Sequence, residues 1–89
     1  MTTKKILFLG ASAQQMPPIK YAVQQGHYVI TCDYLPDNPG HKLADEWYNV
    51  STTDMDAVLA LAKRAKVDGV VAYASDPAAP TQAYVAEKM

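Results

Sequence analysis

Three short segments of the chain combine backbone N–H groups with polar side chains that could bind an anion. They are residues 10–16, 33–42 and 74–77. The first supplies a loop backbone, a hydroxyl and two amides from Gly10, Ala11, Ser12, Gln14 and Gln15. It leads into a predicted helix, whose N-terminus attracts negative charge, so a phosphate or a carboxylate would fit there. A tight strand-to-helix turn that needs only Gly10 explains the same residues, and both interpretations stay open.

The second segment places a carboxylate, Asp33, directly after a predicted strand and shortly before Pro36. Asp33 follows Gly10 at about the 20-residue spacing of the acid that binds a ribose in dinucleotide-binding folds. The glycine fingerprint of those folds is incomplete, because Ser12 and Gln15 stand at its second and third glycine positions. Dinucleotide binding is therefore the second interpretation.

The third segment offers a hydroxyl and a carboxylate, from Ser75 and Asp76, to the same predicted cleft. Asp76 also suits the N-cap of the helix that follows, with a proline in its first turn, and this capping explains the pair without a ligand. The remaining candidates indicate no further chemistry. His41 has no second ligand at metal-binding spacing, so we expect no metal, and Cys32 lies in a predicted buried strand as a small apolar residue.

Continuous apolar and β-branched runs predict the strands that position these segments. They cover residues 6–9, 28–32, 46–50 and 70–73. One helix is predicted from Pro17 to a cap at Gly26, and another begins at a Thr53 cap followed by Asp56, whereas residues 33–42 are predicted as loop. This order predicts an α/β fold with an open, mainly parallel four-stranded, Rossmann-like sheet and helices on both faces. The three segments then meet at the C-terminal edge of the sheet, and Thr53 lies at the opposite edge.

The chain has 89 residues, of which 49% are hydrophobic and 19% charged, with a formal net charge of -1. We expect a single domain over residues 1–89, because so short a chain buries one core. The balanced charge gives no attraction to nucleic acid or anionic lipid, so neither is an expected partner. No run resembles a signal peptide or a transmembrane helix, which predicts a cytoplasmic address. The helical pattern of residues 83–89 has no end signal, so we expect a truncated chain.

Two motifs and three shorter runs occur together in this sequence. The motifs are D-x-x-P-x-x-P-G at 33–40 and S-D-x-A-A-P-T at 75–81, and the runs lie at 5–11, 50–54 and 68–71. With them the chain resembles the N-terminal, pre-ATP-grasp domain of ATP-grasp ligases over nearly its whole length. The likeness is strongest to carbamoyl-phosphate-synthase-like and carboxylate-amine ligase-like members. The combination of the two motifs is far more specific than either one alone.

The resemblance implies that this chain forms one wall of a larger active site. Full-length members activate a carboxylate or bicarbonate as an acyl phosphate with ATP and Mg²⁺ and pass the acyl group to an amine-type acceptor. Two later domains, which have no counterpart in this chain, bind ATP and Mg²⁺, and the N-terminal domain helps to hold the carboxylate or the acceptor. We therefore expect a small carboxylate or amine substrate and the C-terminal ATP-grasp domains as partners. We expect neither a cofactor nor a catalytic residue in this chain, and no activity of the chain alone.

The family's loops map onto the substrate-binding positions of this sequence. Gly10, Ala11 and Ser12 match the loop after the first strand, Asp33 and Pro36 match the second loop, and Ser75 and Asp76 match the third. Gln14 joins them from its place in the first segment, and Ser12 stands where many members carry glycine. Two alternatives from other classes stay open: a free-standing dinucleotide-binding module, and a non-catalytic scaffold or dimerisation domain, with a homodimer as a further option.

Overall fold

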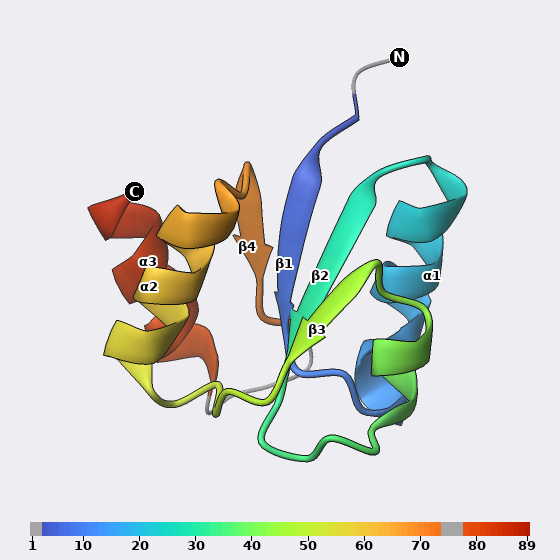
Figure 1. Ribbon diagram of the computed structural model, residues 1–89, viewed down its shortest axis with the longest axis horizontal. Coiled ribbons are helices and arrows are strands. Elements are labelled where there is room, and N and C mark those ends of the chain that lie inside the picture. The colour runs from blue at the N-terminus through green and yellow to red at the C-terminus, as the bar shows by residue number, and fades with distance from the viewer. Residues whose placement is uncertain (1–2, 74–77) are drawn as a thin grey trace.

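The computed structural model describes residues 3–73 and 78–89, and within these ranges strands and helices alternate (Figure 1). The strands are β1 Lys5–Leu9, β2 Tyr28–Cys32, β3 Glu46–Tyr48 and β4 Gly69–Val71. The α-helices are α1 Met16–Gln24, α2 Met55–Ala65 and α3 Ala79–Lys88, and two short 3-10 helices are η1 Ala13–Gln15 and η2 Pro39–Lys42. None of the described helices has the length and apolar character needed to cross a membrane.

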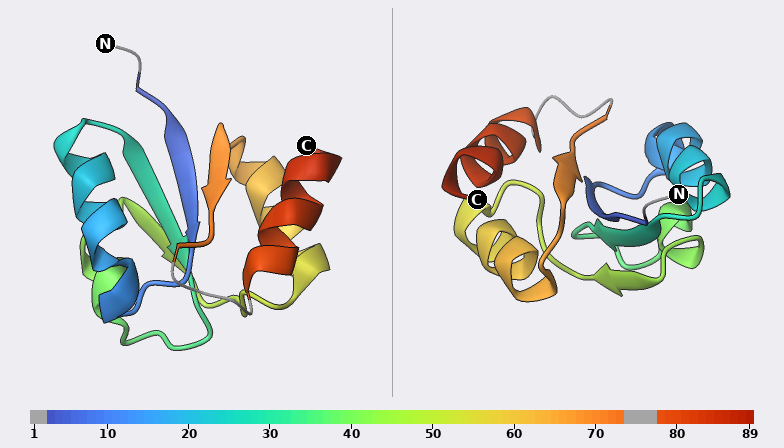
Figure 2. Two further views of the ribbon diagram at one scale, coloured as in Figure 1. Left: turned by 180° about the vertical axis from the view of Figure 1, so that it is seen from behind. Right: turned by 90° about the horizontal axis from the view of Figure 1, so that it is seen from above.

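All strands of the sheet are parallel, in the order β3-β2-β1-β4. In the central strand β1, Leu7 lies opposite Ile30 of β2 and Val70 of β4. Continuous apolar runs are typical of strands that are covered on both faces, and Figures 1 and 2 show α1 on one face and α2 with α3 on the other. The predicted α/β class, parallel sheet and two helical layers are therefore confirmed.

Alternating strand residues contribute to two separate apolar cores. On the α2 and α3 side the buried members are Leu7, Leu9, Ile30, Cys32, Val58, Leu61, Ala62, Val67, Ala78 and Val85. On the α1 side they are Phe8, Ile19, Ala22 and Val29. Full burial of one large aliphatic side chain contributes about 1.5–3 kcal/mol. The α2 and α3 layer therefore provides the larger part of the hydrophobic stabilisation.

Two strands end earlier than the sequence predicts. β4 stops at Val71 because β1 pairs with it only as far as Phe8. Beyond that point the carbonyl of Tyr73 accepts a hydrogen bond from the Gln15 side chain instead of a strand neighbour. β3 also stops early, where its partner β2 ends. Within the predicted loop, residues 39–42 form η2.

The edge strand β3 is held by one carboxylate that accepts hydrogen bonds from two phenols. The hydroxyls of Tyr28 and Tyr48 each donate to Glu46 at 2.5 Å. These bonds favour the ionised carboxylate and the protonated phenols. They lower the pKa of Glu46, and the bond from Tyr28 to Glu46 is the largest cause that raises the pKa of Tyr28 to about 12. A strand of three residues is thereby anchored to β2 through side chains as well as backbone.

The helix boundaries confirm one predicted cap and correct another. Gly26 follows α1 with a φ of +80°, a conformation that glycine adopts without strain. The N-cap of α2 is Asp54, whose carboxylate accepts a hydrogen bond from the N–H of Ala57 at 3.2 Å. The prediction of Thr53 is wrong by one residue, because α2 begins at Met55 and the Thr53 hydroxyl pairs with a neighbouring serine.

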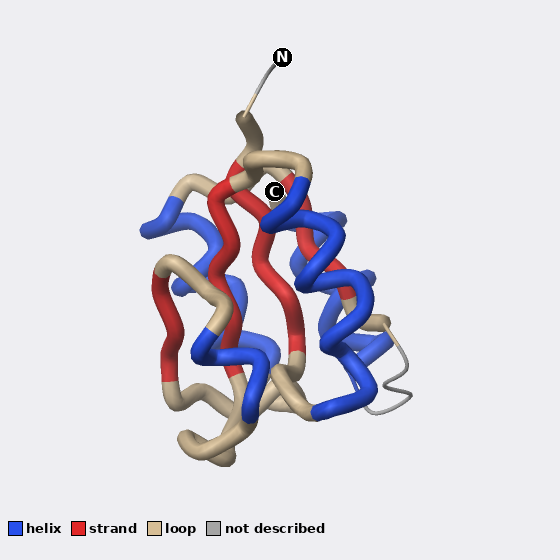
Figure 3. The backbone as a smooth tube through the Cα atoms, turned by 90° about the vertical axis from the view of Figure 1, so that its right-hand side faces the viewer, coloured by secondary structure: helices blue, strands red, loops and turns tan. Residues whose placement is uncertain are grey.

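The start of α2 lies at the C-terminal edge of the sheet, together with the loops after β1 and β2 (Figures 1 and 3). The expectation that Thr53 lies at the opposite edge is therefore wrong. A helix that follows a parallel strand begins where that strand ends, and α2 follows β3 through a short connection. The other predicted cap, Asp76, lies outside the described residues.

The capping contact of α2 makes a prediction about stability. Asp54→Ala removes the acceptor for a helix N-terminal N–H, so we expect it to lower the free energy of unfolding by about 1 kcal/mol. Thr53→Ala serves as the matched control and should change it by less than about 0.5 kcal/mol. Urea denaturation followed by circular dichroism measures both variants. A larger loss for Thr53→Ala than for Asp54→Ala would contradict the assignment of the cap.

Candidate functional site

The carboxylate of Asp33 joins the two loops that form the C-terminal edge of the sheet. It is buried, with 7% of the residue exposed. Its Oδ2 accepts a hydrogen bond from the N–H of Ala11 at 3.0 Å and from the Asn38 amide at 2.8 Å, and its Oδ1 accepts from the N–H of Leu35 at 3.1 Å. Residues 10–12 and 33–38 are therefore held by one side chain, as charge-assisted hydrogen bonds of this kind are strong.

A buried glutamine ties the first loop to the end of β4. Gln15, with 4% of the residue exposed, donates its amide N–H to the carbonyl of Tyr73 at 2.8 Å. Its Oε1 accepts the N–H of Ser12 at 3.0 Å and also the Ser12 hydroxyl. The same side chain lies 3.2 Å from the position that a Cβ on Gly10 would take, and Gly10 has a φ of +107°. Gln15 is thus a structural part of the loop and fills the space next to Gly10.

Gly40 is a residue whose role the sequence analysis missed. Its N–H donates to the carbonyl of Ala11 at 2.7 Å, so η2 lies directly against the first loop. A Cβ at this position would meet the Ala11 carbonyl oxygen at 2.7 Å and the Ile19 side chain at 2.9 Å. The Pro-Gly pair within the 33–40 motif is the signal that could have indicated a close approach of the backbone.

The predicted site residues have different surroundings in the structure. The N–H of Gly10 donates to the carbonyl of Cys32 at 2.8 Å, and both backbone polar groups of Ala11 are engaged as described above. Gln14 is exposed and Ser12 is half-buried, so these side chains border the edge from the first loop. Ser75 and Asp76 lie outside the described residues. Contact with a ligand stays a prediction for all of them.

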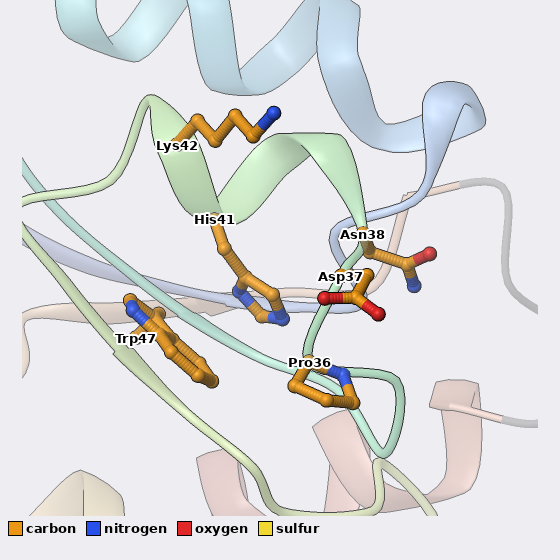
Figure 4. A pocket seen from close by; sticks show the side chains of 6 residues that line it. All are labelled: Pro36, Asp37, Asn38, His41, Lys42 and Trp47. Atoms are coloured by element: carbon orange, nitrogen blue, oxygen red, sulfur yellow. The ribbon is translucent and has the colours of Figure 1, made fainter.

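The loop after β2 also forms one side of a pocket of about 310 Å³ (Figure 4). Its lining residues are Pro36, Asp37, Asn38, His41, Lys42 and Trp47. His41 is buried, and its Nδ1 lies 2.7 Å from the Thr31 hydroxyl and its Nε2 lies 3.3 Å from the Leu35 carbonyl oxygen. The His41 ring packs on Trp47 with ring centroids 4.8 Å apart and planes tilted by 33°. Of the predicted site residues in the described ranges, Pro36 is the one that lines this pocket.

Cys32 is buried in β2, as predicted. Burial, and after it the charge of Asp33, raises the pKa of the thiol to about 12. A thiol with so high a pKa is not a nucleophile at neutral pH. Within the described residues, no group of three or more His, Cys, Asp or Glu side chains is placed to hold a metal ion.

The close approach of Gly40 to the first loop makes a prediction about stability. Gly40→Ala inserts a Cβ against a backbone oxygen, and we expect it to lower the free energy of unfolding by about 1–3 kcal/mol. Gly69→Ala is the matched control, because a Cβ there meets nothing within 4 Å. It should be neutral or slightly stabilising, since alanine costs less conformational entropy than glycine. Chemical denaturation of both variants measures the difference, and equal losses would contradict the close packing of η2 on the first loop.

A comparison with models of known protein families finds no match, whereas solved structures match closely. Phosphoribosylglycinamide synthetase from Anaerococcus prevotii is 27% identical with a TM-score of 0.87, covering 98% of this chain and 22% of that chain. N5-carboxyaminoimidazole ribonucleotide synthetase from Thermotoga maritima is 23% identical with a TM-score of 0.79, covering 97% of this chain and 23% of that chain. The chain therefore spans less than a quarter of the length of these proteins.

A structure from a different class also matches. WbmH from Bordetella bronchiseptica, solved in complex with NAD⁺, is 20% identical with a TM-score of 0.62, covering 82% of this chain and 26% of that chain. At this identity the likeness concerns the fold alone. The Thermotoga maritima match, at 23% identity, likewise concerns the fold alone. Phosphoribosylglycinamide synthetase is an ATP-grasp ligase, and its N-terminal domain matches nearly the whole of this chain at 27% identity. The resemblance of this chain to the N-terminal domain of ATP-grasp ligases is therefore confirmed by its structure.

Proposed function

We propose that this chain is the substrate-side domain of an ATP-dependent ligase that activates a carboxylate or bicarbonate as an acyl phosphate and transfers it to an amine-type acceptor. The observation that carries the proposal is the match to phosphoribosylglycinamide synthetase, at 27% identity over 98% of this chain. ATP and Mg²⁺ would be held by domains outside this chain. The matching N5-carboxyaminoimidazole synthetase from Staphylococcus aureus was solved with ADP, which supports nucleotide use by the whole enzyme.

The interlocked loops suit the task of holding a substrate in place. Asp33 and Gln15 connect segments that are far apart in the sequence, so the edge is formed before a substrate arrives. A preformed edge costs less conformational entropy on binding than a mobile one. The Ser12 hydroxyl and the Gln14 amide border this edge. The Ser12 O–H donates to Gln15, so its oxygen is left to accept from an amine, whereas the Gln14 amide can bind a carboxylate or an amine. The proposed role of this domain is therefore positioning, and the chemistry takes place between it and the ATP-binding domains.

The dinucleotide-binding alternative has the fold of the NAD⁺-bound WbmH, but the loop geometry does not support it. A ribose would need an accessible carboxylate at Asp33, whereas Asp33 is 7% exposed and accepts three hydrogen bonds within the chain. A pyrophosphate would need an open backbone at the first loop, whereas the side chain of Gln15 lies there. We therefore favour the ligase domain over a dinucleotide module.

Nucleotide titrations of the chain distinguish these two functions. We expect no binding of ATP or NAD⁺ with a Kd below about 10 μM, because the described residues form neither a glycine-rich phosphate loop nor a free ribose-binding acid. Isothermal titration calorimetry measures both ligands. NAD⁺ binding tighter than this value that Asp33→Ala weakens tenfold or more would favour the dinucleotide module.

A second experiment tests the substrate-side role in a protein that joins this domain to ATP-binding domains. Ser12→Ala or Asp76→Asn should lower kcat/KM for the carboxylate or the acceptor about tenfold, the size of one lost hydrogen bond to a charged group, and leave the KM for ATP unchanged. Gly26→Ala is the control, since it strains a φ of +80° at the opposite edge and costs about 1–2 kcal/mol of stability. The proposal is refuted if kcat/KM of the loop variants falls only in proportion to the fraction of folded protein, as we expect for Gly26→Ala. The loops would then have a structural role alone.

A further inference from the structure

The pocket between η2 and β3 contains the single tryptophan of the chain in a half-exposed position. Trp47 lies on the edge strand β3 with 47% of the residue exposed. The ring of His41 packs on it from η2, and Pro36 adds a further apolar wall from the loop after β2 (Figure 4). Because His41 covers only part of the Trp47 indole, the exposed part of the ring offers an electron-rich π surface to a ligand.

The polar groups around this indole favour a positive ligand. Both ring nitrogens of His41 are engaged within the chain, and the Asn38 amide N–H donates to Asp33. The carboxylate of Asp37 lines the pocket as a hydrogen-bond acceptor. The lining has two basic side chains, His41 and Lys42. The Lys42 side chain extends along η2 with its ammonium directed away from Trp47 in Figure 4. The pocket therefore combines the aromatic surface of Trp47 with the carboxylate of Asp37.

We propose that this pocket binds an organic cation, with a guanidinium group on the indole of Trp47 and its N–H donors on the carboxylate of Asp37. A guanidinium is planar, stacks on aromatic rings and forms bidentate hydrogen bonds with carboxylates, which fits both partners. The pocket shares residues 36–38 with the loop that Asp33 orders, so the cation is held beside the candidate edge. That the cation belongs to the acceptor substrate rests on the proposed function, whereas its binding to the pocket does not.

The experiment uses Trp47 as its own probe, because it is the one tryptophan in the chain. The chain is titrated with methylguanidinium and, separately, with methylurea, a neutral planar molecule with similar N–H donors, at constant ionic strength. We expect a saturable change of tryptophan fluorescence with methylguanidinium and none with methylurea. Since a cation over an exposed ring and an exposed ion pair are each weak, the Kd should lie in the millimolar range and should rise with added salt.

Two charge variants test which carboxylate is responsible. Asp37→Asn keeps the shape of the side chain and should weaken methylguanidinium about three- to fivefold, which is the effect of one exposed ion pair. Glu87→Gln is the matched control, because it changes the net charge equally on α3, on the other side of the sheet (Figure 2), and should leave the Kd unchanged. Circular dichroism verifies that each variant is folded.

Each other result overturns the proposal. The pocket is no cation site if methylguanidinium gives no saturable signal, if methylurea gives the same signal, or if Asp37→Asn and Glu87→Gln have equal effects. If Asp37→Asn fails to fold, the salt dependence of the wild-type titration decides, and a Kd independent of salt refutes a charged contact. None of these measurements involves ATP or catalysis. A titration without a fluorescence change would therefore refute the cation site but not the proposed ligase role. An inactive ligase would refute the ligase role but not a measured cation site.

Discussion

The C-terminal edge of this small sheet depends on one buried carboxylate. Asp33 accepts hydrogen bonds from the backbone of Ala11 and Leu35 and from the side chain of Asn38, so a single charge satisfies donors from two loops. A buried carboxylate is tolerated only when such donors surround it, and the donors in turn would be costly to bury without it. The loops therefore provide the donors that allow Asp33 to be buried, and Asp33 provides the acceptor that these donors need. This set of hydrogen bonds determines the shape of the edge.

Further hydrogen bonds connect the loops that Asp33 holds to η2, to the segment after β4 and to β2. Because Ala11 is held by Asp33, its carbonyl faces η2, and only a glycine at position 40 lets the two backbones approach to hydrogen-bond distance. Gln15 extends the arrangement to the end of β4 through the Tyr73 carbonyl. The His41 ring, fixed between Thr31 and Leu35, then places one wall of the pocket against Trp47. Side chains that the hydrophobic pattern does not reveal thus position the loops after β1 and β2, η2 and the edge strand β3.

This distinction explains what the sequence could and could not predict. Strands such as β2 follow from continuous β-branched runs, and the parallel sheet follows from alternation with helices, because both depend on local patterns and on the handedness of crossovers. The α2 cap differs by one residue because Thr53 and Asp54 are both good caps and only the helix start decides between them. The Pro-Gly pair at Gly40 signals a close approach of the backbone, but it does not say which segment is approached. The roles of Gln15 and Trp47 likewise depend on contacts between residues distant in the sequence, which local patterns do not predict.

The match to an NAD⁺-bound enzyme shows why the fold alone does not decide the function. A parallel sheet brings the loops after its strands to its C-terminal edge whatever they bind, so the overall similarity measures the scaffold and not the site. The difference lies in a few side chains. In a dinucleotide site the backbone after β1 must stay bare so that a pyrophosphate can approach, and the acid after β2 must stay free. Here Gln15 packs beside Gly10, and Asp33 is committed to the loops. This edge therefore has no open backbone for a pyrophosphate, and its loops are held rigidly by hydrogen bonds. Rigid loops suit the proposed role of holding a small substrate while other domains bind the nucleotide.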